Sequence, residues 1–345
     1  MFNYILRRIL VMIPTLLGIT VIVFVIINLA PGSPVEQKLQ QIRFGGGGGM
    51  ATNSGSASSG GQSVVSQEVL DALNEQYGFD KPLHMRYFIW LKNLTTLDFG
   101  ESFTYEEPAW DVIVSKFPVS LQFGVASLLL SYIICIPLGM MKAVRHGTAF
   151  DLISSFVLFA MYSIPGFMLA ILLIVYFAGG SFFTWFPIGE LHSYEYYSMG
   201  FWEKAVDRLH HFVLPLICYM ISSFTVLTML MKNSLLEEIK KDYIRTARAK
   251  GVSEKFIYLK HALRNALIPI VTGLGSFLAI FFAGSLLLET IFNLDGIGLL
   301  SYRSILERDY NVIMGLVFFQ SFLMLIGNLI SDIAYVIVDP RIDFS

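Results

Sequence analysis

The sequence predicts an all-α membrane protein that crosses the bilayer six times, and three observations support this prediction. Hydrophobic residues make up 55% of the 345 residues and charged residues only 14%, whereas a soluble domain has about 25% charged residues. Six apolar runs are each long enough for the roughly 20 helical residues that cross a bilayer core. Basic residues concentrate on one side of these runs. The net charge of −2 gives no indication of nucleic-acid binding.

The predicted spans contain no Lys, Arg, Asp or Glu before Asp332, which lies in the last of them. Each span contains Gly or Pro, which allow close helix approach and kinks inside membranes. We interpret these residues as packing sites, with bending around a transport pathway as the alternative. The first run follows Arg7 and Arg8 and is too long for the core of a signal peptide, so we expect it to be retained. The spans cover residues 9–29, 117–141, 152–177, 212–231, 266–288 and 312–336.

The distribution of basic residues predicts that both termini are cytoplasmic. With the N-terminus inside, the outer segments are 30–116, 178–211 and 289–311. The inner segments hold more Lys and Arg than the outer segments, although their combined length is less than half that of the outer segments. Cytoplasmic loops carry an excess of basic residues, so the inner segments are assigned to the cytoplasm. They are 1–8, 142–151, 232–265 and 337–345.

The chain is divided into three regions by this topology. Residues 1–30 form the N-terminal span, 31–116 an extended periplasmic region, and 117–345 a core of five spans with the cytoplasmic loop 232–265. The Gly/Ser tract at 44–63 is expected to be flexible, because it has too little apolar surface to offset the entropy of ordering it. No Lys follows its glycines, so it is not a phosphate-binding loop. We expect ordered packing over 64–116.

Residue types that often mark chemistry are scattered in this sequence. Cys135 and Cys218 lie inside apolar runs, where a small buried thiol is the expected state. His192, His210 and His211 have no Cys or carboxylate cluster beside them at ligand spacing. We therefore predict no catalytic residues, no metal site and no cofactor.

Four further residues are candidate structural or gating positions. Gly296 and Gly298 permit a sharp bend in the third outer segment, ahead of an apolar helical stripe. Asn328 and Asp332 stand one helical turn apart near the cytoplasmic end of the last span. An acidic residue inside a membrane is a functional candidate by default. Because Asp332 lies close to the interface, we favour a structural, hydrogen-bonded role.

The stretch Asp242–Pro269 is the polar segment most in need of an explanation, because a connection between spans needs only a few residues. A helix is predicted over Leu235–Ala249, Gly251 breaks it, and Ser253 with Glu254 begins a second helix that reaches about Ile268. Small residues beside the bend would let a partner surface approach. The basic flanks suit anionic membrane lipid or an acidic partner. A solvated linker is the alternative, and it explains the charge but not the two helices.

Within this stretch, DYIRTARAKG and HALRNALIP resemble the Glu-Ala-Ala loop of permease subunits of bacterial ABC importers, in the version of the dipeptide/oligopeptide family. The Glu of the general pattern is absent. The N-terminal motif resembles the B-type half of the permease pair, and the glycine-rich insertion resembles the Yej-type branch, associated with peptides and the peptide antibiotic microcin C. Other resembling motifs are RRILVMIPTLLGITVIVFVIINLAPGSP, YGFDKPLHMRYFIWLKNLTTLDFGESF, FPVSLQFG, IPLGMMKAVRHGT, ETIFNLDGIG, RDYNV and DPRIDF.

The resemblance implies the fold of a type I ABC importer permease and a non-catalytic role in the bacterial inner membrane. A periplasmic binding protein would deliver short peptides, and microcin C-like peptides are included in this expectation. A second permease subunit would complete a heterodimer, with one or two ABC ATPase subunits docked on the cytoplasmic loop. The chain has no Walker motif, so its partners would hydrolyse ATP. The implied coupling residues are Tyr243, Arg245, Thr246, Ala247, Ala249, Gly251, Val252, Phe256 and Leu259.

Two other classes of function remain as alternatives. An ion-coupled secondary peptide transporter would need ionisable groups at the membrane midplane or paired broken helices, and charge is nearly absent from the spans. A membrane enzyme or assembly factor would need clustered reactive groups near an interface, which the sequence does not contain.

Overall fold

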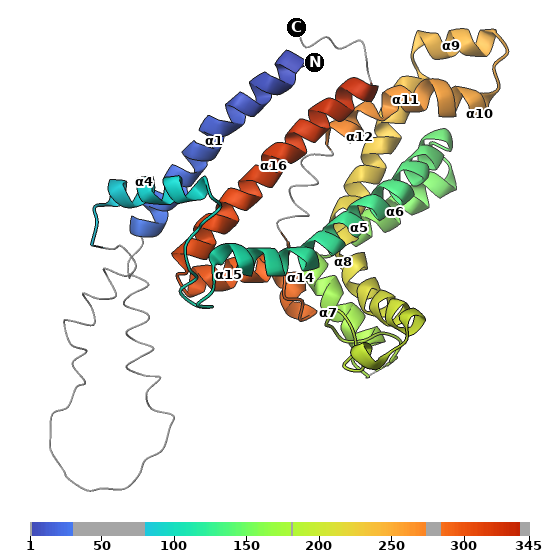
Figure 1. Cartoon of the computed structure of the whole chain (residues 1–345). Helices are drawn as coiled ribbons and strands as arrows, with labels where there is room; N and C mark the ends of the chain where they lie inside the picture. The colour runs from blue at the N-terminus through green and yellow to red at the C-terminus, as the bar shows by residue number, and fades with distance from the viewer. Residues whose placement is uncertain (1, 30–79, 181, 274–283, 339–345) are drawn as a thin grey trace, which may run out of the picture. The chain divides into compact units, whose positions relative to one another are not determined.

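The computed structural model describes residues 2–29, 80–180, 182–273 and 284–338, and the regular elements within them are helices (Figure 1). The long helices are α1 (Phe2–Leu29), α5 (Ala109–Val144), α8 (Phe201–Ile239) and α16 (Tyr310–Val338). The shorter ones are α4 (Leu83–Leu94), α6 (Ala149–Tyr162), α7 (Gly166–Phe177), α9 (Asp242–Ala249), α10 (Glu254–Phe256), α11 (Leu263–Ala266), α12 (Ile268–Thr272), α14 (Leu286–Ile291) and α15 (Ile297–Leu306), with a 3₁₀ turn at Tyr196–Ser198 and a π-helical segment at Ile257–Ala262.

Membrane-length helices account for most of the predicted spans. Three described helices are long and apolar enough to cross a bilayer, and they lie in α1, α5 and α16. Two more spans follow if α6 with α7, and the two parts of α8, are each counted as one bent span. The predicted span 266–288 includes residues 274–283, which lie outside the described residues, so the total of six stays a prediction. The Gly/Ser tract at 44–63 and the ending DPRIDF also lie outside them.

Two of the spans are sharply bent. The axes of α6 and α7 meet at 95°, and the two parts of α8 meet at 52° around residue 222. Pro165 is the N-cap of α7 and has extended backbone angles. A proline has no N–H to continue a helix, and it disfavours helical geometry in the residue before it. The Pro-Gly pair in the span 152–177 therefore breaks the helix outright.

The prediction of one helix over 235–249 is wrong at its middle, because α8 ends at Ile239 and α9 begins at Asp242. Ile239 and Ile244 both pack into the same apolar cluster. On a continuous helix two residues five apart would point about 140° away from each other. The extended backbone of Lys241 breaks the helix and lets both side chains reach that cluster.

The described residues form two compact units, and the borders between them fall inside α1, α5, α15 and α16. One unit contains residues 14–115 and 301–319. In it the DFGESF and RDYNV motifs meet, although they are about 200 residues apart in the sequence. Buried Asp309 accepts hydrogen bonds from the Ser102 hydroxyl and, at 3.2 Å, from the Thr104 N–H. Asp309 also accepts one from the Val312 N–H in the first turn of α16, at 3.3 Å.

The other unit contains residues 1–13, 116–300 and 320–345, and two apolar clusters lie among its described residues. One surrounds Leu235 and Ile257 beside the inner loop, and the other surrounds Phe123 and Phe292. Cys135 belongs to the first cluster and Cys218 to the second, and both are free thiols. The prediction of small buried cysteine side chains is confirmed.

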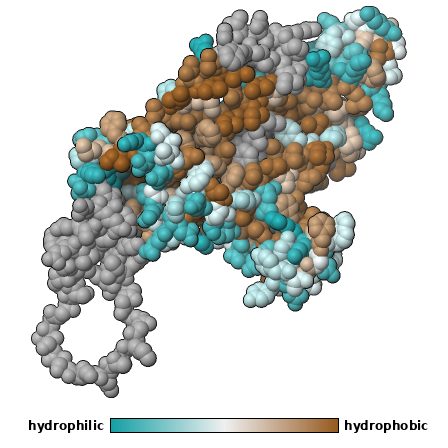
Figure 2. All heavy atoms as spheres, in the orientation of Figure 1, coloured by the Kyte–Doolittle hydropathy of each residue, from teal (hydrophilic) through white to brown (hydrophobic). Residues whose placement is uncertain are grey.

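Many large apolar side chains on the predicted spans are exposed. Phe156 has 76% of its surface exposed, Ile133 65% and Leu152 65%. Figure 2 shows hydrophobic residues over the long helices and hydrophilic ones mainly on the connecting segments. A soluble protein rarely exposes such large contiguous apolar patches, whereas a bilayer requires them. These faces are suited to lipid or to other membrane subunits.

Candidate functional site

The inner loop continues directly from the end of α8. Figure 1 shows α9 and α10 as a short helical hairpin that leads through the π-helical segment into α11. The stretch is therefore built as a folded helical turn, as its two-helix sequence pattern predicted, and not as an irregular linker. A π-helical segment inserts an extra residue into a helix and is frequent at functional sites.

The bend between α9 and α10 is a Schellman motif centred on Gly251. This glycine has a φ of +79°, a left-handed conformation that costs a residue with a Cβ atom and suits glycine. Its N–H donates to the Arg248 carbonyl at 2.9 Å, and the Val252 N–H donates to the Ala247 carbonyl at 3.2 Å. The pairing satisfies carbonyls at the end of α9 that would otherwise lack partners. The shape of the bend is thus fixed by its backbone.

The inner face of α9 is anchored in the apolar cluster around Leu235. Ile244 and Ala247, three residues apart, are both buried there, with Val252 packed against them. Ile257, the first residue of the π-helical segment, is buried in the same cluster. The small side chain of Ala247 therefore faces the core of the loop, where it permits close packing, and does not face outward.

A cluster of hydrogen-bonded polar side chains lies at the base of the hairpin. Buried Glu238 accepts a hydrogen bond from the Tyr243 hydroxyl at 2.5 Å and forms an ion pair with Lys241. The Asn265 amide donates to the Tyr243 oxygen at 3.1 Å. Partial burial, and then the hydrogen bond to Glu238, raise the pKa of Tyr243 to about 12. Tyr243 therefore remains a protonated donor at physiological pH and joins α8, α9 and α11.

The outer face of the hairpin presents most of the predicted coupling residues. Phe256 and Leu259 each have half of their surface exposed. Arg248 bridges the bend, with its Nε 2.6 Å and its Nη2 3.1 Å from the two carboxylate oxygens of Glu254. This pairing raises the pKa of the Arg248 guanidinium and lowers that of the Glu254 carboxyl. The remaining exposed coupling residues are Tyr243, Arg245, Thr246, Ala249 and Gly251, and Val252 is half-buried.

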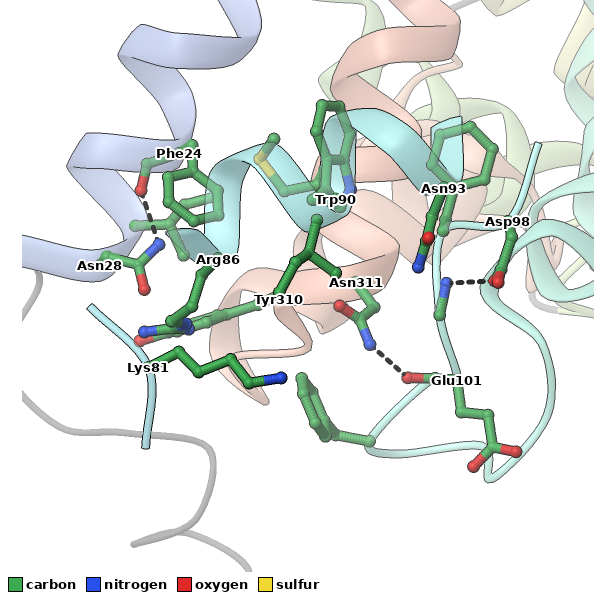
Figure 3. A pocket seen from close by; sticks show the side chains of 16 residues that line it. Phe24, Asn28, Lys81, Arg86, Trp90, Asn93, Asp98, Glu101, Tyr310 and Asn311 are labelled. Atoms are coloured by element: carbon green, nitrogen blue, oxygen red, sulfur yellow. Dashed lines mark hydrogen bonds between the residues drawn. The ribbon is translucent and has the colours of Figure 1, made fainter. Parts of the chain in front are cut away.

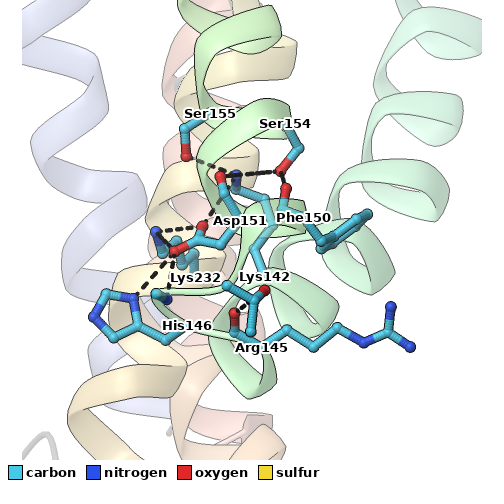
Figure 4. A network of polar contacts seen from close by, with 10 residues as sticks. Lys142, Arg145, His146, Phe150, Asp151, Ser154, Ser155 and Lys232 are labelled. Atoms are coloured by element: carbon cyan, nitrogen blue, oxygen red, sulfur yellow. Dashed lines mark hydrogen bonds and ion pairs between the residues drawn. The ribbon is translucent and has the colours of Figure 1, made fainter.

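Sequence reasoning missed a buried charge network close to this loop (Figure 4). Asp151, in the first turn of α6, lies within 2.6 and 2.8 Å of the Lys232 ammonium on α8. Lys142 on α5 lies 3.3 Å from the same carboxylate and donates to the hydroxyls of Ser154 and Ser155 at 2.7 and 2.8 Å. The network joins α5, α6 and α8.

A sequence signal for this network exists. Lys142 follows the predicted span 117–141, Asp151 precedes the span 152–177, and Lys232 follows the span 212–231. Charged residues placed directly at the ends of three apolar runs lie at the same membrane depth. Because all three side chains are buried, their charges must be paired with one another.

Gly296 and Gly298 are predicted as structural or gating positions. Gly296 lies against buried Glu289, and Gly298 lies against the backbone at the start of α14. A Cβ atom on Gly296 would lie 2.6 Å from the Glu289 carboxylate, and one on Gly298 would lie 2.7 Å from the Leu286 backbone nitrogen. Glu289 accepts hydrogen bonds from the Ser120 hydroxyl at 2.8 Å and the Leu299 N–H at 2.7 Å. The motifs FPVSLQFG and ETIFNLDGIG therefore meet at this carboxylate.

The two candidates in the last span lie apart from that carboxylate. Asp332 is 3.0 Å from the Arg8 guanidinium, so this carboxylate pairs with a basic residue near the start of α1. Asn328 is half-buried one turn earlier. The structural role favoured for Asp332 stays a prediction. Among the described residues, no group of three or more His, Cys, Asp or Glu side chains could hold a metal ion.

Comparison with known proteins defines the class of this membrane protein. Residues 135–344 match the family of binding-protein-dependent transport system inner membrane components. The chain belongs to this family. It is a multi-pass inner-membrane transport subunit that works with a binding protein and ATPase subunits, and it is not an enzyme, as predicted. Membership also confirms the predicted all-α permease fold.

Individual relatives place the chain more closely. It is 43% identical to the peptidoglycan transport system permease protein YejB of Agrobacterium fabrum, over 99% of this chain and 98% of the relative. Identity is also 43%, with the same coverage, to the inner membrane ABC transporter permease protein YejB of Escherichia coli O157:H7. The chain is 34% identical to the oligopeptide transport system permease protein AppB of Bacillus subtilis, over the full length of both chains. The resemblance to the Yej-type branch is confirmed.

Proposed function

We propose that this chain is a permease subunit of an ATP-driven ABC importer that takes up short peptides, and that the α9–α10 hairpin receives force from an ATPase subunit. The observation that carries this proposal is the combination of an exposed outer face with a firmly anchored inner face. Such a surface can be pushed as one body, which a solvated linker cannot.

The substrate class follows from what the relatives' names share. They are described as permeases for peptidoglycan, oligopeptides and, in the case of a Bacillus subtilis relative 33% identical to this chain, dipeptides. Each of these solutes contains peptide bonds, so a short peptide is the common chemistry. The Yej-type resemblance adds microcin C-like peptides to the proposed range.

The proposed docking surface combines apolar and basic groups. Phe256 and Leu259 supply apolar contact area, and Arg245 and Lys250 supply exposed positive charge. An ATPase surface with an apolar groove and an acidic rim would complement it. A second permease subunit completes the proposed heterodimer, and the translocation pathway runs between the two subunits.

The proposed orientation places both termini and the hairpin in the cytoplasm. The contact between Arg8 and Asp332 supports it, because it brings the start of α1 and the inner end of α16 to the same side of the membrane. The density of basic residues in 232–265 supports the cytoplasmic assignment of that side.

The geometry also supports a route for the motion. The Glu238–Tyr243–Asn265 group joins the hairpin to α8, and Lys232 on α8 holds Asp151 of α6. A push on α9 therefore acts on two spans through buried, directional contacts. Such a route fits a permease that alternates between inward-open and outward-open packings.

The test is ATP-dependent uptake of a labelled tripeptide by the complete importer in proteoliposomes. Gly251→Pro removes the left-handed bend, and Ala249→Trp places a bulky group on the exposed face. Both should abolish uptake while leaving the protein in the membrane fraction. Ala247→Trp should instead lower the amount of folded protein, because Ala247 is buried. The matched control is Ala205→Trp, an exposed alanine on the outer half of α8, which should keep uptake.

Normal uptake by both Gly251→Pro and Ala249→Trp would show that the hairpin does not couple ATP hydrolysis to transport. Uptake by this chain under a pH gradient, without any ATPase subunit, would favour the ion-coupled transporter instead.

A further inference from the structure

Helix α4 has one face that packs against protein and one face that is exposed. On the packed face, Arg86 and Trp90 line a cavity together with Phe24 of α1 (Figure 3). On the exposed face, Phe88 has 65% of its surface exposed and Met85 50%. These two side chains are three residues apart, so they lie side by side on the helix. Adjacent large apolar side chains at a surface are suited to a further contact.

The exposed face of α4 is also positively charged. Lys92 follows Phe88 by one helical turn and is exposed on the same side. A lysine at the end of an apolar face can extend its ammonium group to lipid head groups. From Lys81 to Leu97 the chain contains three Lys or Arg residues and no Asp or Glu. Apolar and basic residues together are typical of helices in the interfacial layer of a membrane, and the positive charge favours anionic head groups.

The contact between α4 and α1 gives the depth of α4 in the membrane. Helix α4 crosses α1 near the C-terminal end of α1 (Figure 1). The Tyr87 ring is 5.3 Å from the Phe24 ring between centroids, and the Tyr87 hydroxyl is 3.0 Å from the Thr20 hydroxyl. Phe24 precedes Leu29, the last residue of α1 and of the predicted span 9–29, by about 8 Å along the helix axis. Interfacial helices bury their apolar face about 5–10 Å into the boundary between head groups and acyl chains, so α4 lies at the expected depth.

The exposed surface of α1 at this end supports a lipid contact. Ile22 and Ile26 are each more than half exposed and belong to the same compact unit as α4. Because α1 is long and apolar enough to cross the bilayer, these side chains face acyl chains or another membrane subunit. A soluble partner does not reach this depth, and a second subunit packed on α4 would have to enclose the Lys92 ammonium, which is costly without a counter-charge. Lipid is therefore the occupant that fits both helices.

We propose that α4 is an interfacial helix, with Met85 and Phe88 among the acyl chains of the outer leaflet and Lys92 at anionic phospholipid head groups. The choice of leaflet rests on the orientation given in the proposed function, whereas the depth does not. Trp90, on the opposite face of α4, packs on Phe99 at 6.5 Å between ring centroids. The lipid contact therefore holds the segment that contains Phe99 near the membrane surface.

Spin labels test the proposal, because their collisions with oxygen, which concentrates in lipid, and with a water-soluble nickel chelate show what a residue faces. Each label is attached to a single cysteine in a background with Cys135→Ala and Cys218→Ala, and the complete importer is placed in vesicles of phosphatidylethanolamine and phosphatidylglycerol. The label at Phe88→Cys should collide more often with oxygen than with the chelate, as at Ile22→Cys, which is exposed on α1. The label at Glu107→Cys, an exposed loop residue of the same unit, should show the opposite preference.

Further variants test the face and its charge. A label at Met85→Cys should give the same result as one at Phe88→Cys, because the two side chains lie side by side. Lys92→Glu should shift the Phe88→Cys label toward water, since it replaces a cation at anionic head groups with an anion. Lys92→Arg is the matched control, which keeps the charge and should cause no shift. Co-purification of each labelled chain with its partner subunits confirms that it has folded.

Several results would overturn the proposal. If the Phe88→Cys label collided with the chelate as often as the Glu107→Cys label, α4 would face water, and if a later addition of the binding protein then shielded it from both reagents, the face would be a docking site for that protein. A label that neither reagent reaches would show that another subunit covers α4. No shift with Lys92→Glu would exclude anionic head groups as the contact of Lys92. These collision rates do not depend on transport, so their failure is distinct from failure of the uptake assay.

Discussion

Asp151 and Glu289 are both buried carboxylates, but they are stabilised in opposite ways. Asp151 is surrounded by cations, with Lys232 and Lys142 on two other helices. Glu289 is surrounded by neutral donors, which are the hydroxyls of Ser120 and Tyr219 and the N–H groups of Ser285 and Leu299. Asp151 is thus paired with full positive charges, whereas Glu289 is held only by the dipoles of neutral hydrogen-bond donors.

The difference teaches what each site can tolerate. Two ammonium groups share one carboxylate at Asp151, so the loss of that carboxylate leaves uncompensated buried charge. At Glu289 the cage depends on shape. The Ile297 N–H donates to the Ser120 oxygen at 2.8 Å, which directs the Ser120 hydrogen toward Glu289. We therefore expect Asp151 to be sensitive to charge and Glu289 to be sensitive to geometry.

The largest effect is expected for Asp151→Asn, which should destabilise the protein by about 3–5 kcal/mol because it leaves two buried lysines without a counter-charge. The measurement is the thermal unfolding midpoint of the purified importer, together with the amount of the chain in membranes. Adding Lys232→Met to this variant should recover part of the loss, since a cation is removed with the carboxylate. A double variant no more stable than Asp151→Asn would mean that charge balance is not the cause.

A geometric change at the second site should come next. Gly296→Ala places a Cβ atom 2.6 Å from the Glu289 carboxylate and the Ser120 hydroxyl, and overpacking of this kind costs about 1–3 kcal/mol. The matched control is Gly18→Ala on α1, where a Cβ atom would meet nothing within 4 Å. Thermal unfolding of both variants checks the prediction. If they were equally stable, the cage around Glu289 would have to be looser than described.

Glu289→Gln isolates charge from shape at the same position. An amide offers only one acceptor oxygen, so its NH₂ group must face a donor such as the Leu299 N–H, which now lies 2.7 Å from a carboxylate oxygen. We expect a loss of about 1–2 kcal/mol, smaller than for Asp151→Asn. Chemical denaturation of the two variants side by side measures the ratio. A larger loss for Glu289→Gln would reverse the comparison.

Much of the fold could be predicted from the sequence, because the signals that define it are local. A bilayer requires long apolar runs, and described helices of membrane length, with each bent pair counted as one, account for five of the six predicted spans. The bend at Gly251 follows from a glycine placed between two helix-forming segments. The breaks at Lys241 and Pro165 are harder to predict, since propensity alone does not separate a kink from a complete break.

Contacts between distant residues could not be predicted. Ser120 and Glu289 are 169 residues apart, and Asp151 and Lys232 are 81 apart. The sequence places Asp151 and Lys232 at the ends of apolar runs, and so at one membrane depth, but it does not say which charged residues pair there, and it gives no signal for the contact between Ser120 and Glu289. For the same reason, the predicted coupling residues could be named but not sorted into an exposed face and a buried one. Ala247 is predicted as a coupling residue together with Arg245 and Ala249, but it packs with Ile244 and Val252 in the core.

The exposed pair Arg248–Glu254 extends the comparison to a third carboxylate, for which we expect the smallest effect on stability. Both groups are exposed, and exposed ion pairs contribute little. The pairing lowers the pKa of Glu254 below its ordinary value of 4.5. Its contribution to stability is therefore present above pH 4.5 and is lost as the pH falls through the lower pKa of the folded state.

Arg248→Ala should leave the unfolding midpoint almost unchanged at pH 7 and remove this small acid-dependent contribution. Unfolding midpoints from pH 3 to pH 7 check both points. A loss at pH 7 as large as that of Glu289→Gln would show that the bend depends on this ion pair, and not on the backbone hydrogen bonds around Gly251.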